Sequence, residues 1–214
     1  GDFLLREECR VPLRALEILK KRHGEEVAIV GKVFGPWTLG YHVFGVEEFL
    51  INTILDPDAV KRAMETLKEV TVAFAGAQID SGADALTLGD HATRDLCSPA
   101  AYREFLMDIH RELNERIGCP IILHICGDTS DRIQYIRETG IACFHFDSKV
   151  PAGKARELAG DRMALMGGTS NFDIVLNGTP DTIAADVREK VEAGIDIIGP
   201  ECAVPLNAPW RNLR

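Results

Sequence analysis

The stretch that decides the fold is Pro120-Ile121-Ile122-Leu123-His124-Ile125-Cys126-Gly127-Asp128, an apolar run that ends in polar and small residues. Side chains two apart on a strand point to the same side, so His124 and Cys126 can face one ion together. A second apolar run, at 195–198, leads to Cys202. One nitrogen and two sulfurs form a zinc ligand set with an open fourth position, as in catalytic zinc sites. On residue chemistry alone, a buried, hydrogen-bonded histidine beside a core cysteine explains the pattern equally well.

Short apolar runs alternate with longer amphipathic stretches along the chain. We expect six strands, at 27–33, 84–90, 121–126, 142–147, 163–167 and 195–198. We expect helices between them, at 56–79, 98–116, 130–138, 152–159 and 179–194. Several of these helices begin at a capping residue followed by proline, which is a strong local start signal. Strands that alternate with helices predict a parallel α/β sheet.

Polar residues follow the C-terminal ends of nearly all the expected strands. They are Asp90, His124, Cys126, Asp147, Thr169, Ser170 and Cys202. Such a distribution is typical of the active-site face of a TIM (β/α)8 barrel. Because about six strands are expected rather than eight, we expect residues 1–214 to form a single, partial barrel domain. That domain would lack its N-terminal strands and its last helix. A doubly wound sheet is the alternative architecture.

The composition excludes several classes of function. The chain has 214 residues, 46% of them hydrophobic, and a net charge of −9. An acidic chain without a basic stripe is not expected to bind nucleic acid, and no apolar run is long enough to span a membrane. Six cysteines are too sparse for a disulfide framework, so we expect reduced thiols and a cytoplasmic protein.

Four further stretches resemble the uroporphyrinogen decarboxylase superfamily. They are Gly35-Pro36-Trp37-Thr38-Leu39, residues 96–105 (Leu-Cys-Ser-Pro-Ala-Ala-Tyr-Arg-Glu-Phe), Phe146-Asp147-Ser148-Lys149-Val150 and Gly167-Gly168-Thr169-Ser170-Asn171. Within that superfamily, His124, Cys126 and Cys202 are similar to the zinc motif of the cobamide-dependent methyltransferases. True decarboxylases have a Gly-His-Gly type of turn where this chain has residues 200–205, which favours the methyltransferase branch.

The resemblance implies a zinc-dependent methyltransferase of the kind found in methanogenesis. It would move a methyl group from methylcobalamin or another methylated corrinoid to a thiol such as coenzyme M. A separate corrinoid protein is the expected partner. A decarboxylase-like lyase and a non-catalytic corrinoid-binding module are the alternative functions. The loops at 90–93 and 168–171 differ from the coenzyme M enzymes, so the sequence leaves the identity of the thiol open.

The remaining candidate residues have structural alternatives. Asp90 is a candidate catalytic residue that could orient the thiol, although a cap or a loop salt bridge explains it equally well. Asp147 could support His124 from an adjacent strand end, or cap the turn that follows its own strand. Glu201 precedes a candidate ligand and could assist the metal, but a solvated acid is the simpler expectation. Candidate cofactor-binding or substrate-binding residues are Thr169, Ser170 and Asn171, which could donate to an anionic tail or simply form a turn.

Overall fold

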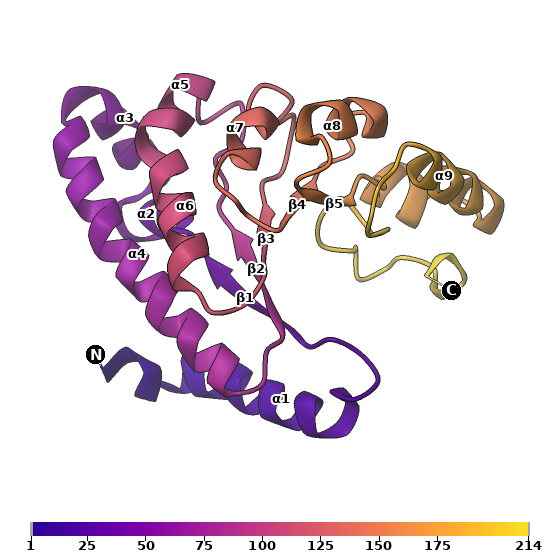
Figure 1. Ribbon diagram of the computed structural model, residues 1–214, viewed down its shortest axis with the longest axis horizontal. Helices are drawn as coiled ribbons and strands as arrows, with labels where there is room; N and C mark the ends of the chain where they lie inside the picture. Colours follow the sequence, from indigo (N-terminus) through magenta and orange to yellow (C-terminus); the bar gives the residue numbers. More distant parts are fainter. Residues whose placement is uncertain (1, 214) are drawn as a thin grey trace. The chain divides into compact units, whose positions relative to one another are not determined.

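The computed structural model describes residues 2–213 and contains one five-stranded sheet with the strand order β1-β2-β3-β4-β5 (Figure 1). The strands are β1 (Val30–Phe34), β2 (Ala85–Gly89), β3 (Ile121–His124), β4 (Cys143–Phe146) and β5 (Ala164–Gly167). The β1–β2 and β4–β5 pairs are parallel, with Val30 opposite Ala85 and Cys143 opposite Ala164. Parallel neighbours that are consecutive in sequence need a crossover connection, which here contains a helix each time. The α/β prediction is confirmed.

Nine α-helices and four short helical turns are present among residues 2–213. The α-helices are α1 (Glu7–His23), α2 (Pro36–Phe44), α3 (Val46–Leu55), α4 (Pro57–Asp80), α5 (Pro99–Ala101), α6 (Met107–Arg116), α7 (Ile133–Arg137), α8 (Ala152–Ala159) and α9 (Pro180–Glu192). The short turns are η1 (Asp2–Leu5), η2 (Tyr102–Leu106), η3 (Asn171–Leu176) and η4 (Trp210–Asn212). In the described part of the chain, no helix combines the length and apolar character needed to cross a bilayer.

Capping chemistry explains why three of the long helical segments begin where the sequence predicts. Asp56 accepts a hydrogen bond from the Ala59 amide and Pro57 occupies the first turn of α4. Ser98 caps the segment that begins at α5 in the same way. Thr179 and Thr182 form a reciprocal capping box at the start of α9. Each cap satisfies amide groups that a helix N-terminus leaves without an intrahelical partner.

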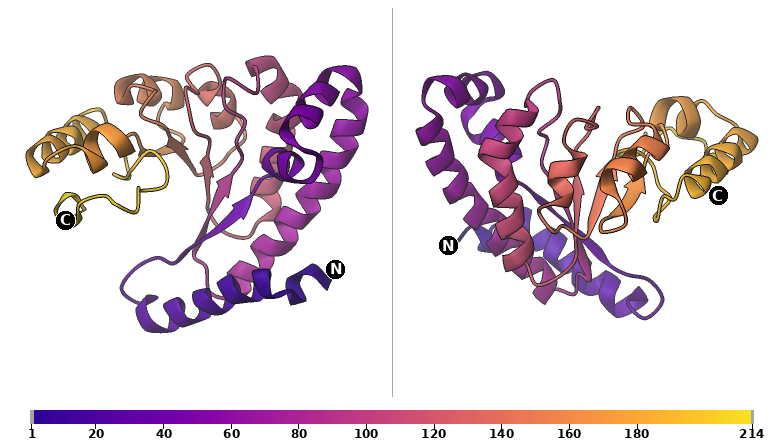
Figure 2. Two further views of the ribbon diagram at one scale, coloured as in Figure 1. Left: turned by 180° about the vertical axis from the view of Figure 1, so that it is seen from behind. Right: turned by 45° about the horizontal axis from the view of Figure 1, so that its top comes forward.

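The chain divides into two compact units, and the first contains residues 1–91 and 108–123. In this unit α4 lies alongside β1 (Figure 2). Gln78 on α4 bonds both backbone groups of Lys32: its Oε1 accepts from the Lys32 amide at 2.9 Å and its Nε2 donates to the Lys32 carbonyl at 2.8 Å. The side-chain amide therefore takes the place that a neighbouring strand would take beside β1.

The second unit contains residues 92–107 and 124–214. All four residues of β4 are buried, and α8 packs against β5 in this unit (Figure 1). Phe144, Phe146 and Leu165 are fully enclosed and form the apolar centre of the unit. A strand with both faces buried is what a parallel sheet covered by helices requires.

The expected strand at 195–198 is not formed, which corrects the count of six strands to five. In the described residues, the β-type pairing of 195–200 with the chain around β5 consists of two isolated bridges, Met166 to Ile197 and Thr169 to Pro200. The amides of Asp196 and Ile197 both donate to the Leu165 carbonyl, which breaks the one-to-one pairing of a ladder. Pro200 has no backbone N–H group, so it cannot donate the hydrogen bond that would extend the ladder.

The expected strand at 27–33 begins later, at Val30. The Val27 amide donates to the His23 carbonyl at 3.0 Å, so Val27 belongs to the turn that ends α1. The expected helix at 130–138 also begins later, at Ile133. Both the amide and the hydroxyl of Ser130 donate to Asp128, which holds this residue in an Asx turn ahead of the helix.

Candidate metal centre

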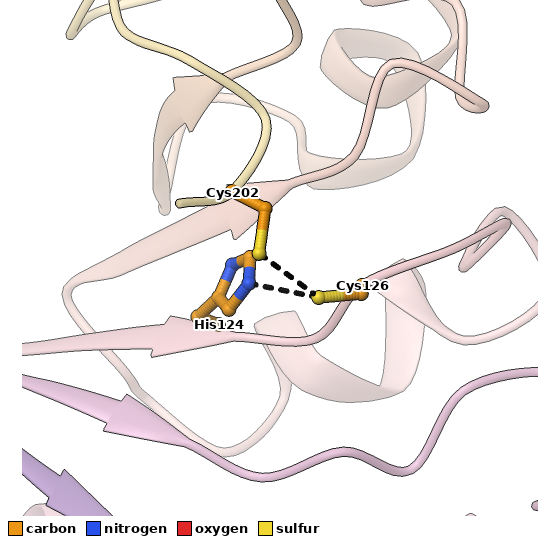
Figure 3. A group of neighbouring side chains, drawn as sticks. All are labelled: His124, Cys126 and Cys202. Carbon is orange, nitrogen blue, oxygen red and sulfur yellow. Dashed lines mark hydrogen bonds between the residues drawn. The ribbon is translucent and has the colours of Figure 1, made fainter. Parts of the chain in front are cut away.

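The side chains of His124, Cys126 and Cys202 lie close together in the second unit (Figure 3). The two cysteines are 76 positions apart in sequence. His124 Nε2 lies 3.1 Å from Cys126 Sγ, and the two sulfurs are 3.5 Å apart. His124 ends β3 and is buried, whereas both cysteines are half-buried. None of the six cysteines forms a disulfide. The sulfurs at 3.5 Å are therefore neighbours without a covalent bond, which would bring them to about 2 Å.

Two distances between the ligand atoms are close to those of a tetrahedral zinc site. Zinc–sulfur bonds of about 2.3 Å and zinc–nitrogen bonds of about 2.0 Å place two sulfurs about 3.8 Å apart, and nitrogen and sulfur about 3.5 Å apart. The distances of 3.5 Å and 3.1 Å are shorter by a few tenths of an ångström, so a small outward movement would admit the ion. An imidazole with two thiolates is a donor set that suits zinc, and three protein ligands leave a fourth position open.

A backbone carbonyl sets the tautomer of His124. Its Nδ1 lies 3.2 Å from the carbonyl oxygen of His145 on β4. Only a protonated Nδ1 can donate to that oxygen, so Nε2 keeps its lone pair on the side of the cysteines. This is the arrangement in which a metal-binding histidine is oriented by a hydrogen bond from its other ring nitrogen.

The side chain of His145 connects this strand to the segment that carries Cys202. Its Nε2 donates to the carbonyl of Pro200 at 2.8 Å, and its ring lies 4.3 Å from that of His124, centroid to centroid. Gly167 makes room for the ring: a Cβ there would lie 2.5 Å from the His145 Cδ2 atom, and its φ of +99° favours glycine. His145 is not among the residues predicted from the sequence, because its partner, the Pro200 carbonyl, lies 55 positions away.

Asp147 lies next to the cysteine-bearing turn after β3. Its Oδ2 accepts from the Gly127 amide at 2.8 Å and its Oδ1 accepts from the Lys149 amide at 3.0 Å. Asp147 thus caps its own turn and also holds the residue that follows Cys126. Asp128 lies two residues beyond Cys126, and hydrogen bonds from the Ser130 hydroxyl and from Arg94 keep the pKa of its carboxyl below the usual range.

The three residues predicted to bind substrate already form hydrogen bonds within the chain. Thr169 Oγ1 donates to Asp186 at 2.7 Å. Ser170 accepts from the Asp173 amide as the cap of η3. Asn171 Nδ2 donates to the Ala203 carbonyl at 2.9 Å, so its position beside the Cys202 segment is fixed. Their role toward a substrate stays a prediction.

Asp90 follows β2 in the first unit, where its carboxylate is completely buried. Its Oδ1 accepts from the Thr38 amide at 2.8 Å, and its Oδ2 lies 3.0 Å from His110 Nε2. The Gly35 backbone packs so closely on Asp90 that a Cβ at Gly35 would lie 2.2 Å from the carboxyl carbon. These contacts give Asp90 a structural role; its catalytic role stays a prediction.

Glu201 is not the solvated acid that the sequence suggests. Its two carboxylate oxygens accept from the amides of Asn171 at 2.8 Å and Ser148 at 3.2 Å. Both partners are distant in sequence, so no local pattern around Glu201 could identify them.

Comparison with known proteins places these features in a family. The uroporphyrinogen decarboxylase (URO-D) family profile matches residues 2–214. A methylated-thiol–coenzyme M methyltransferase of Methanosarcina mazei is 37% identical over 98% of this chain and 58% of its own length. The methylcobamide:CoM methyltransferase MtaA of Methanosarcina barkeri is 29% identical over 100% of this chain and 64% of its own length.

A solved structure agrees with this assignment. A methyltransferase from Methanosarcina mazei superposes with a TM-score of 0.96 and 29% identity, over 100% of this chain and 64% of that protein. The chain therefore spans about three fifths of the length of the curated relatives that it matches. Matching strands, a matching fold and a profile that extends over residues 2–214 lead to one conclusion: the chain belongs to the uroporphyrinogen decarboxylase family.

Proposed function

We propose that this chain carries the zinc site of a methyltransferase that moves a methyl group from a methylated corrinoid to a thiol such as coenzyme M. The convergence of His124, Cys126 and Cys202 within 4.8 Å of one another is the observation that carries the proposal. The names of the two relatives support it, because both describe methyl transfer to coenzyme M.

The chemistry requires a thiol to react as a thiolate. A free alkyl thiol is mostly protonated at neutral pH and is a weak nucleophile in that form. Zinc, when bound, would take the substrate sulfur at its open position and lower the pKa of that thiol. In the transfer, the carbon–cobalt bond breaks with its electron pair staying on cobalt, which goes from cobalt(III) to cobalt(I). The methyl group forms a thioether with the sulfur.

The residues of this chain contribute charge and orientation. Cys126 and Cys202 would bind as thiolates, and their two negative charges would keep electron density on a third sulfur, so that it stays nucleophilic. His124 would bind through its neutral Nε2, because the carbonyl of His145 accepts from Nδ1. Asp147 holds the turn after Cys126 through the Gly127 amide.

The methyl donor we infer is a corrinoid on a separate protein, and the expected compartment is the cytoplasm. In this reaction Thr169, Ser170 and Asn171 are the candidates for contact with the substrate, and Asp90 for orienting the thiol. An activity screen with coenzyme M, homocysteine and other small thiols would identify the thiol acceptor.

The first experiment measures the metal content of purified, freshly reduced protein by elemental analysis. We expect about one zinc per chain in the wild type and its loss in His124→Ala and Cys202→Ala. Cys119→Ala is the matched control, because Cys119 is also a half-buried free thiol but lies outside the ligand group. The same preparations are assayed for thiol-dependent loss of the methylcobalamin absorbance.

Two outcomes would contradict the proposal. If Cys202→Ala transferred methyl groups at the wild-type rate, Cys202 could not be an essential zinc ligand. A wild type without zinc, indifferent to chelators, would favour the decarboxylase-like reaction, and corrinoid binding without turnover would favour a binding module.

A further inference from the structure

The segment that carries Cys202 has no regular secondary structure of its own. Between the bridge at Ile197 and η4 at Trp210, the chain forms only bends, turns and one bridge at Pro200. His124, in contrast, ends a strand whose ladder fixes its backbone. A metal ligand must be held to within about half an ångström of its working geometry, so something else has to fix the position of Cys202.

Hydrogen bonds from β4 and from the loop after β5 supply this restraint. The Pro200 carbonyl accepts from His145 Nε2 at 2.8 Å. The Glu201 amide donates to the Thr169 carbonyl at 2.8 Å. The Ala203 carbonyl accepts from Asn171 Nδ2 at 2.9 Å. Residues on both sides of Cys202 are thus fixed through their backbones.

The Glu201 carboxylate adds the contact that joins these supports. Oε1 accepts from the Asn171 amide in the loop after β5, and Oε2 accepts from the Ser148 amide in the turn after β4. One side chain next to Cys202 therefore crosslinks the two loops that flank the cysteine-bearing segment. Hydrogen bonds from backbone amides to a carboxylate are charge-assisted and about twice as strong as neutral ones.

We propose that Glu201 is a positioning residue that holds Cys202 in the ligand set through its bonds to the Ser148 and Asn171 amides. Its carboxylate oxygens are directed to backbone amides, and it is not part of the described group of ligand atoms, so it acts through Cys202 rather than as a ligand. This inference rests on the proposed function, because it assumes that the three ligands bind a metal ion.

Cobalt(II) substitution provides a test that does not depend on turnover. The near-ultraviolet absorbance of bound cobalt reports how many thiolates coordinate it, and competition with a chelator gives its affinity. In Glu201→Ala we expect the affinity for cobalt to fall by about 10- to 100-fold, as for other residues that orient metal ligands. We also expect the thiolate absorbance to fall toward that of Cys202→Ala.

Glu201→Gln is the conservative variant, and its expected loss is smaller. Its amide oxygen can accept from one of the two backbone amides, whereas its NH2 group would face the other donor. Glu157→Ala is the control, because Glu157 is an exposed glutamate on α8 whose partner is Lys154. Thermal unfolding of each metal-free variant separates a loss of the ligand geometry from a loss of the fold.

The outcomes separate this inference from the proposed function. A wild type that binds neither zinc nor cobalt would overturn both. A wild type that binds cobalt normally, with an unchanged spectrum and affinity in Glu201→Ala, would overturn only the positioning role. If Glu201→Ala does not fold, Glu201→Gln decides: an unchanged cobalt spectrum and affinity in that variant also overturns it.

Discussion

Replacement of Asp90 by alanine tests the buried network at the end of β2. The side chains of Asp90 and His110 are both fully shielded from solvent. The carboxylate accepts from the Thr38 amide at 2.8 Å and contacts His110 Nε2 at 3.0 Å. Alanine removes the carboxylate that both groups contact while they stay buried.

The magnitude follows from these two lost contacts. Each buried polar group that loses its partner costs about 1–3 kcal/mol. We therefore expect the two lost contacts of Asp90→Ala together to lower the free energy of unfolding by about 2–6 kcal/mol. A domain of this kind is stable by about 5–15 kcal/mol, so the loss is large. Asp90→Asn keeps one acceptor and should lose about 1–3 kcal/mol.

Urea unfolding followed by circular dichroism, with linear extrapolation, gives these free energies. Asp80→Ala is the control, because Asp80 is an exposed aspartate at the end of α4, where a substitution should change stability by less than about 0.5 kcal/mol. A loss below about 1 kcal/mol in Asp90→Ala would refute the reasoning from burial. Methyl transfer by Asp90→Asn tests the prediction that Asp90 orients the thiol. A folded but inactive variant would support this prediction, and a fully active variant would contradict it.

Three further predictions concern other described contacts. The Ile29 amide lowers the pKa of Asp84, so the ionised carboxylate stabilises the fold above about pH 4. This contribution is lost as the pH falls through the lowered pKa. Asp84→Asn should therefore be less stable than the wild type at pH 7, and acid unfolding curves of the two proteins should converge. Burial raises the pKa of Cys143 to about 12, so only about one thiol in ten thousand is ionised at pH 8, and mass spectrometry should find this cysteine unmodified after brief alkylation of the folded protein. Gly167→Ala should lower the free energy of unfolding by about 1–2 kcal/mol or more and weaken zinc binding. The φ of residue 167 is +99°, and the Cβ of alanine would displace the His145 ring. A variant with the stability and zinc affinity of the wild type would contradict this.

Local chemistry explains which parts of this fold the sequence could predict. The helix beginning at Pro57 depends on an aspartate cap and a proline in its first turn, which are adjacent in sequence. The two-residue period of a strand predicts that His124 and Cys126 face the same side, although β3 ends at His124 and Cys126 lies two residues beyond it. Cys202 lies 76 residues from Cys126, so no local pattern pairs the two cysteines. The apolar run at 195–198 suggests Cys202 as a third ligand, and the family resemblance favours that choice.

Contacts between distant residues explain what the sequence could not predict. The run Ile195-Asp196-Ile197-Ile198 has the composition of a strand, but a strand also needs regular pairing, and two of its amides share the Leu165 carbonyl. Glu201 resembles any solvated acid until the loops after β4 and β5 bring two amides to it. His145 is equally ambiguous, because its role depends on the Pro200 carbonyl, 55 residues away.

The end of β4 supports all three ligand-bearing segments. The His145 carbonyl orients His124, Asp147 holds the amide after Cys126, and the Ser148 amide bonds the glutamate before Cys202. All four residues of β4 are buried, so this support is part of the packed core and does not require the metal. Small zinc domains, in contrast, fold only when the ion binds. We therefore expect the chain to be ordered before an ion binds, and a ligand set held in place in this way could leave its fourth position to a substrate thiol.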